Sequence, residues 1–316
     1  MKKILVVILS LIFLAACGGG KNVPDSGTNF TVTDHAGRVV GFSRIPDKII
    51  SLSPGVTEIV FALGLNDKLV GVTSFCDYPA GAGNIEKIGG YSTVDKEKVI
   101  ERIGGDTDGS VIFASTLHAT PGGVLSDLEQ LGYRAVVFEA NTIDRLFDCM
   151  KLVNRIGGGG SKADAVIESL EARVNAVKSG IDADTPEVTV MHEVFGGHWI
   201  AGANTLENDI ITTAGGINIG ASRGAGYGQI NIEGIIDANP DKIVIVSQMG
   251  NMVDGLVSSE ITDNPVFRVL DAVKNRRVYV IDADIVSRSG PRAVDGLEEY
   301  ARILHPEIFG NTAVAH

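Results

Sequence analysis

The sequence predicts an α/β protein of two similar lobes joined by one long helix. Three observations carry this prediction. Short runs of β-branched residues alternate with helical patterns in the first half of the chain, one long helical pattern follows, and the alternation then returns. Strands that alternate with helices indicate βαβ units on a mainly parallel sheet. Two such lobes enclose a cleft, and clefts of this kind are where small ligands bind most often.

The first half opens with a predicted hairpin and continues as strands and helices in turn. Residues 30–42 alternate around a turn at residues 34–37. The strands that follow are short and β-branched, and the helical segments carry apolar residues three and four positions apart. We expect strands at residues 49–52, 69–72, 110–113 and 134–138, and helices at residues 57–63, 96–103, 124–131 and 143–156.

A glycine run at residues 157–160 separates the halves. A helical pattern of about five turns follows at residues 161–178, with Ser161 as its expected N-cap. The run lacks the Gly-Lys-Ser/Thr sequence of a phosphate-binding loop, so we interpret it as a helix end followed by a helix start. We therefore expect an N-terminal lobe at residues 31–158, a connecting helix at residues 159–182 and a C-terminal lobe at residues 183–316.

The second half repeats the pattern of the first. In each half a glutamate opens a helix that leads into a strand: Glu97 precedes the strand at residue 110, and Glu233 precedes the strand at residue 242. This repeat predicts two Rossmann-like lobes, each with a central and mainly parallel sheet. The predicted strands of the second half are residues 188–190, 242–246 and 277–281, and the helices are residues 206–213 and 291–304.

The N-terminal residues indicate export and attachment to a membrane. Two lysines precede an apolar run that ends in Leu-Ala-Ala-Cys17. A charged start, a short apolar stretch and small residues at a cleavage point are typical of a secretory signal. The Leu-Ala-Ala-Cys sequence resembles the prokaryotic lipoprotein signal. This resemblance implies removal of residues 1–16, lipidation of Cys17, and a membrane-anchored location in the periplasm or on the cell surface. The composition that follows, rich in Gly, Asn, Ser and Pro, predicts a flexible tether at residues 17–30.

The composition excludes one class of partner and leaves a question about the cysteines. The chain has 39 acidic and 27 basic residues and a formal net charge of −12. Nucleic-acid binding requires a basic surface, so we exclude it. An acidic surface suits a partner with a basic patch. Outside the cytoplasm Cys76 and Cys149 could form a disulfide, but the sequence does not give the distance between them.

Two patterns match enzyme motifs only in part. Residues 220–224 match Gly-x-Ser-x-Gly around Ser222, but a predicted loop follows where the nucleophile elbow requires a helix. His192 and His198 are six residues apart rather than four, so they do not share a helix face as zinc-protease ligands do. The other histidines are dispersed. We expect a binding protein without catalytic activity, metal site or resident cofactor, with a secreted serine hydrolase as the distant alternative.

Several segments resemble one family of transport proteins, in the same order along the chain. They are residues 51–64, 71–79, 88–91, 214–219, 239–245 and 289–293. The chain is similar to the helical-backbone periplasmic binding proteins of ABC importers, which bind vitamin B12, ferric siderophores or haem, and it most resembles the vitamin B12-binding members. The resemblance implies a monomer that delivers a small molecule to a membrane permease, which works with an ATPase.

The same resemblance implies a ligand site made of aromatic side chains. It assigns this role to Phe75, Tyr91, Trp199 and Tyr227, which lie on predicted loops, two in each lobe. A corrinoid is a large flat ring with an amide fringe. Aromatic rings offer it broad contact area at little cost in side-chain entropy. Arg288 would add hydrogen bonds through its planar fork.

Two other ligands of the family stay open. Arg288 could instead pair with a carboxylate of a ferric siderophore. Haem would need an axial ligand, and Tyr91, Tyr227 and His198 are the candidates. A lone histidine is more often a hydrogen-bonded surface residue, so haem ranks below the siderophore.

The resemblance gives Glu97 and Glu233 a different role. One glutamate per lobe at these positions pairs with arginines of the permease in the family. The helix dipole alone also favours glutamate in a first turn. Their matched placement in the two half-repeats favours docking, which would be sensitive to salt because exposed ion pairs are weak.

Overall fold

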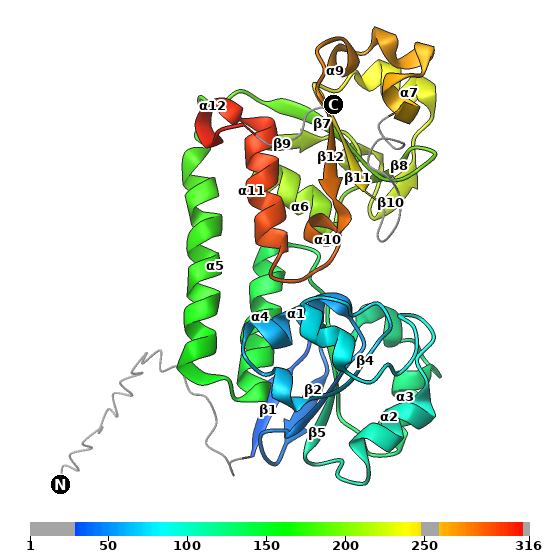
Figure 1. Ribbon diagram of the computed structural model, residues 1–316, viewed down its shortest axis with the longest axis vertical. Helices are drawn as coiled ribbons and strands as arrows, with labels where there is room; N and C mark the ends of the chain where they lie inside the picture. Colours follow the sequence, from blue (N-terminus) through cyan, green and yellow to red (C-terminus); the bar gives the residue numbers. More distant parts are fainter. Residues whose placement is uncertain (1–28, 248–258, 312–316) are drawn as a thin grey trace, which may run out of the picture.

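Two α/β lobes are bridged by one long helix, α5 (Gly160–Gly180), in the computed structural model (Figure 1). The structure describes residues 29–247 and 259–311. This arrangement confirms the predicted fold class, an α/β protein of two lobes with mainly parallel central sheets. The predicted signal peptide, the lipidation site Cys17 and nearly all of the predicted tether lie outside the described residues.

The N-terminal lobe contains, within the described residues, a parallel sheet of four strands in the order β4-β3-β5-β6. The strands are apolar and almost fully buried, as is typical of a parallel sheet with both faces covered. Their bounds are β3 (Lys48–Ser51), β4 (Leu69–Val72), β5 (Ser110–Ser115) and β6 (Ala135–Phe138). The predicted hairpin forms as β1 (Phe30–Thr33) and β2 (Val39–Phe42), which pair antiparallel.

The helices of this lobe begin where the sequence supplies a cap. The Asp95 carboxylate accepts a hydrogen bond from Lys98 N at 3.0 Å, and the Thr142 hydroxyl accepts one from Arg145 N at 3.1 Å. Such caps satisfy amide groups that have no partner in the first turn. The described helices are α1 (Pro54–Ala62), α2 (Lys96–Ile103), α3 (Val124–Gln130) and α4 (Ile143–Gly157).

The glycine run ends one helix and starts the next, as predicted. Gly158 follows α4 in the left-handed region at φ 72°, which favours glycine because it has no Cβ. The expected N-cap is wrong. Gly159 occupies the cap position of α5 without a side-chain cap bond, and Ser161 lies inside the first turn.

The C-terminal lobe has a mixed sheet of six strands within the described residues. β7, β9, β11 and β12 are parallel. At one edge β8 pairs antiparallel with β7, and β10 pairs antiparallel with β8. β8, β9 and β10 are absent from the sequence predictions because each is three residues long, too short for a periodic pattern. The bounds are β7 (Val188–Phe195), β8 (Trp199–Ala201), β9 (Gly216–Asn218), β10 (Tyr227–Gln229), β11 (Lys242–Ser247) and β12 (Val278–Asp282).

The described helices of this lobe are α6 (Leu206–Thr213), α7 (Ile232–Ala238), α9 (Asp271–Lys274), α10 (Ala283–Val286), α11 (Ala293–Leu304) and α12 (Pro306–Phe309). The closing helix predicted at residues 291–304 is α11. It packs against α5 and α6 and carries the fully buried Tyr300.

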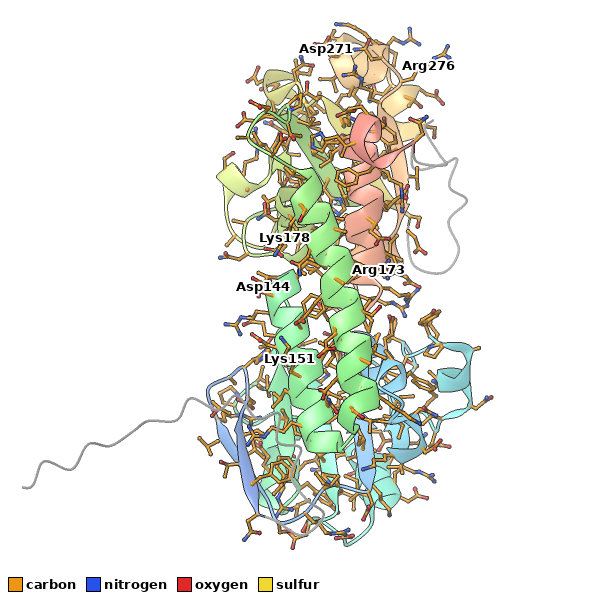
Figure 2. All side chains as sticks on the ribbon, turned by 90° about the vertical axis from the view of Figure 1, so that its left-hand side faces the viewer. Asp144, Lys151, Arg173, Lys178, Asp271 and Arg276 are labelled. Atoms are coloured by element: carbon orange, nitrogen blue, oxygen red, sulfur yellow. The ribbon has the colours of Figure 1, made fainter. Side chains whose placement is uncertain are left out.

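The connecting helix α5 is tied to both lobes. It lies beside α4 of the N-terminal lobe and α11 of the C-terminal lobe (Figures 1 and 2). Lys178 of α5 pairs with Asp144 of α4 at 3.6 Å, and Arg173 pairs with Glu298 of α11 at 2.8 Å. These contacts join α5 to both lobes and restrict how far the lobes can separate. No helix among residues 29–247 and 259–311 is both long and apolar enough to span a membrane.

Cys76 and Cys149 are free thiols, so the disulfide considered from the sequence is not formed. Cys76 Sγ lies 3.2 Å from the hydroxyl oxygens of Thr57 and Thr73. Cys149 Sγ instead faces His35 Nδ1 at 3.7 Å. Each thiol thus has its own buried polar neighbours, and burial raises the pKa of Cys149 to about 12.

Candidate functional site: a cavity between the lobes

A cavity of about 650 Å³ lies between the two lobes. Its wall includes Ser115 at the end of β5 and Glu139 directly after β6, so the carboxyl ends of parallel strands face it. Ligands of open α/β sheets bind at this edge. The volume falls within the range of roughly 300–1,000 Å³ that small-molecule sites occupy.

Three of the four predicted aromatic side chains line this cavity: Phe75, Tyr91 and Tyr227. Phe75 and Tyr227 are half exposed, at 51% and 50%. Large rings left open to solvent in a concave site indicate a binding surface. Trp199 is not among the described residues that line the cavity, and it is 41% exposed. Trp199 and Tyr227 each begin a strand, so their placement on loops was wrong.

Tyr91 is held at the cavity by a buried histidine. His118 Nε2 donates to the Tyr91 carbonyl at 2.7 Å, and the two rings meet edge to face at 5.4 Å. His118 Nδ1 accepts a hydrogen bond from Ser115 N at 3.2 Å. Burial lowers the pKa of His118, which keeps the imidazole neutral and able to accept there. The Tyr91 hydroxyl lies 3.2 Å from Ser115 Oγ.

Tyr227 is held from the opposite lobe by a buried carboxylate. Its hydroxyl donates to both oxygens of Glu207, at 3.1 and 3.2 Å. Glu207 lies in α6 and is only 1% exposed. Burial raises the pKa of Glu207, and hydrogen bonds from Tyr227 and Ser287 oppose the rise. Burial and the contact with Glu207 raise the pKa of Tyr227 above its ordinary range, so the phenol keeps its proton.

Arg288 also lines the cavity, but its guanidinium is already paired with carboxylates. It bonds Asp77 of the N-terminal lobe at 2.5 Å and pairs with Asp284 at 2.8 Å. Beside it, Arg292 makes a bidentate contact to Glu58 of α1 at 2.7 and 2.9 Å. We call these five residues the interlobe clasp. Because the Arg288 guanidinium already pairs with Asp77 across the cleft, it does not present the unpaired N–H groups expected for binding a ligand carboxylate.

The backbones of the two lobes touch beside the clasp. A Cβ on Gly55 would lie 2.5 Å from the Ser289 carbonyl oxygen, so only glycine allows this approach. A further bond joins the lobes where α4 begins, because Ile143 N donates to Asp209 of α6 at 2.7 Å. These contacts fix the separation of the lobes and therefore the width of the cavity.

The sequence predictions did not include Glu58 or Glu207. A signal was present for Glu58, which interrupts a largely apolar helical stretch at a buried position. Glu207 lies in a polar first turn, so its burial had no such signal. Charged side chains are almost never fully buried unless they are paired. The partners of Glu58 and Glu207 lie in distant parts of the chain or on other elements, so hydrophobic periodicity could not identify these partners.

Glu97 and Glu233 occupy matched positions in the two lobes. Each is the second residue of its helix, and each is exposed. The helices begin at the side-chain caps Asp95 and Asn231, which accept from the backbone three residues on. The half-repeat seen in the sequence is therefore also a structural one.

The enzyme and metal motifs do not assemble into a site. Ser222 lies in a short 3₁₀ turn, and its hydroxyl donates to the Ile219 carbonyl at 3.2 Å. His192 is fully buried beside Tyr300, whereas His198 lies 3.4 Å from Glu193. Among the described residues, no three His, Cys, Asp or Glu side chains are grouped so as to hold a metal ion.

Comparison with known proteins places the chain among transport proteins. Residues 49–285 match the family model described as periplasmic binding protein. An uncharacterized ABC transporter substrate-binding lipoprotein, YvrC of Bacillus subtilis, is 30% identical over 315 residues, with 96% of each chain covered.

Solved structures show the same fold. The periplasmic vitamin B12-binding protein of Vibrio cholerae superposes with a TM-score of 0.68 at 24% identity, covering 82% of this chain and 97% of that one. A periplasmic haem-binding protein from Pseudomonas aeruginosa gives a TM-score of 0.71 at 23% identity, covering 83% and 94%. The chain therefore belongs to the periplasmic binding protein family, a family of transport proteins, as an extracytoplasmic substrate-binding protein of the ABC-transporter type.

Proposed function

We propose that the chain is the lipid-anchored binding protein of an ABC importer for a corrinoid such as cobalamin or cobinamide. The observation that carries this proposal is the interlobe cavity, which presents Phe75, Tyr91 and Tyr227 from both lobes. Aromatic faces on a preformed surface bind a broad flat ring at low entropic cost. The likeness to a vitamin B12-binding protein supports the same ligand class.

Delivery to the permease is the second part of the proposal. Glu97 and Glu233 stand exposed at the same point of two equivalent helices, one in each lobe. Two separated carboxylates suit a permease surface that carries basic residues, because complementary charge guides docking and sets its register. Lipidation of Cys17 would hold the protein, as a monomer, close to the permease and its ATPase.

The ion pairs of the clasp favour a corrinoid over a ferric siderophore as the ligand. A ferric siderophore with carboxylates would need an open cation in the cavity, and Arg288 is instead paired with Asp77 and Asp284. Haem therefore replaces the siderophore as the second candidate, because the Tyr91 hydroxyl lies at the cavity wall and could serve as an axial ligand. His198 is not among the described residues that line the cavity.

Isothermal titration calorimetry of the purified full chain tests the ligand. We expect saturable binding of dicyanocobinamide or cyanocobalamin. Tyr91→Ala and Phe75→Ala should each weaken corrinoid binding about 10-fold or more, because each removes roughly 1–3 kcal/mol of aromatic contact. Phe195→Ala is the matched control, since this ring is exposed on β7 and outside the cavity. Binding of haem or a ferric hydroxamate, with no response to either corrinoid, would contradict the proposal.

A further inference from the structure

The Tyr227 hydroxyl is oriented by its buried partner. It donates to both side-chain oxygens of Glu207, at 3.1 and 3.2 Å. The hydroxyl of Ser287, another residue of the cavity wall, is directed to the same carboxylate. Both hydroxyl oxygens therefore retain only lone pairs for a ligand. This part of the wall accepts hydrogen bonds and does not donate them.

The charges around the cavity also disfavour a ligand carboxylate. Glu207 places a carboxylate directly behind Tyr227. Arg288 is the only lysine or arginine among the described residues of the wall, and the acids of the clasp neutralise it. The stretch 248–258, which the structure does not describe, contains no lysine, arginine or histidine in its sequence. A ligand carboxylate at this wall would face lone pairs and a buried acid without a compensating cation.

We propose that Glu207 is a positioning residue that makes this wall selective for ligands whose rim carries hydrogen-bond donors, namely primary amides, and against ligands whose rim carries carboxylates. The inference rests on the proposed function and sharpens it: among corrinoids, the protein takes the amidated forms and rejects those in which the peripheral groups are free acids. An amide N–H at this part of the wall finds an acceptor at Tyr227 or Ser287, whereas a carboxylate placed there finds no donor from these two residues.

Two corrinoids with one ring system test this selectivity. Dicyanocobinamide carries peripheral amides, and dicyanocobyrinic acid carries carboxylates at the same positions. With the full chain at pH 7.5, calorimetry should give at least 10-fold tighter binding of the amide form, since one unpaired polar group in a buried site costs about 10- to 100-fold in affinity.

The variant Glu207→Gln identifies the residue responsible. Glutamine has one acceptor oxygen in place of two, so one of the two hydroxyls can turn its proton into the cavity. We expect the ratio of the two affinities to fall about 10-fold. Glu193→Gln is the matched control, because Glu193 is an equally buried acid of the same lobe that lies outside the cavity wall. In Glu193→Gln the ratio of the affinities for the two corrinoids should equal that of the wild type.

Tyr227→Phe keeps the test decisive if Glu207→Gln does not fold. It removes the acceptor at the cavity and should also reduce the preference for the amide form. An unchanged ratio in a folded Glu207 or Tyr227 variant, or equal binding of both corrinoids by the wild type, would overturn this inference and leave the proposed function standing. Absence of binding to either corrinoid would overturn both.

Discussion

Replacement of Arg292 by methionine tests the energetic role of the interlobe clasp. Arg292 contacts Glu58 through two nitrogens, at 2.7 and 2.9 Å, and the Glu58 side chain is only 2% exposed. Methionine retains much of the side-chain volume, so the change removes the charge without opening a large cavity. Glu58 would then be left buried with only Arg288, 3.9 Å away, as a neighbouring cation.

The expected cost follows from burial. Removing one partner of a buried ion pair costs about 3–5 kcal/mol, because the remaining charge is desolvated and uncompensated. Burial raises the pKa of Glu58 even in the intact clasp, and the arginines oppose that rise. Since Arg288 remains, we expect Arg292→Met to lie near the lower end, at about 3 kcal/mol.

Urea unfolding followed by circular dichroism at pH 7 measures this cost as a change in the free energy of unfolding. Lys151→Met is the matched control. Lys151 pairs with Glu171 at 2.7 Å on the surface, with the lysine 56% exposed, and such pairs contribute about 1 kcal/mol or less. The double variant Glu58→Leu with Arg292→Met should recover most of the loss, because it removes the buried Glu58 carboxylate that the single variant leaves without its arginine.

Equal costs for Arg292→Met and Lys151→Met would refute this reasoning, since a buried and an exposed pair would then behave alike. A double variant no more stable than Arg292→Met would also refute it, because the penalty would not come from the orphaned Glu58 carboxylate.

Three further predictions concern pH, thiols and docking. Burial lowers the pKa of His192 to about 3, from 6.5, so the unfolded chain binds a proton between these values that the native state does not. Stability should therefore fall by up to about 1.4 kcal/mol per pH unit on acidification through this window, and His192→Gln should show a smaller slope in urea titrations. Cys76 and Cys149 should react with Ellman's reagent only in denaturant, and labelling of either of these two thiols in the native protein would contradict their burial. Reversal of Glu97 and Glu233 to arginine should abolish cellular corrinoid uptake without changing ligand affinity, whereas normal uptake would exclude docking at these sites.

The two-lobed architecture could be predicted because it depends on local pattern. Apolar periodicity and the glycine run indicate the positions of most strands and helices, including α5. The edge strands β8 and β10 could not be predicted, since their pairing and not their composition defines them. Tyr227 and Trp199 therefore seemed equivalent in the sequence, although only Tyr227 lines the cavity among the described residues.

The candidate site was predictable in its side chains and not in their pairing. Phe75, Tyr91 and Arg288 do line the cavity. The partner of Arg288, however, is Asp77, which is 211 residues away in the opposite lobe. Only the folded arrangement of the two lobes brings these charges together, so a residue expected to bind ligand is also part of the clasp.

The most direct measurement is a crystal structure of the full chain grown with dicyanocobinamide, using anomalous scattering at the cobalt edge. We expect one cobalt peak between the lobes, with the corrin ring against Phe75, Tyr91 and Tyr227. A peak elsewhere on the surface, or a cavity without cobalt under saturating ligand, would contradict corrinoid capture between the lobes.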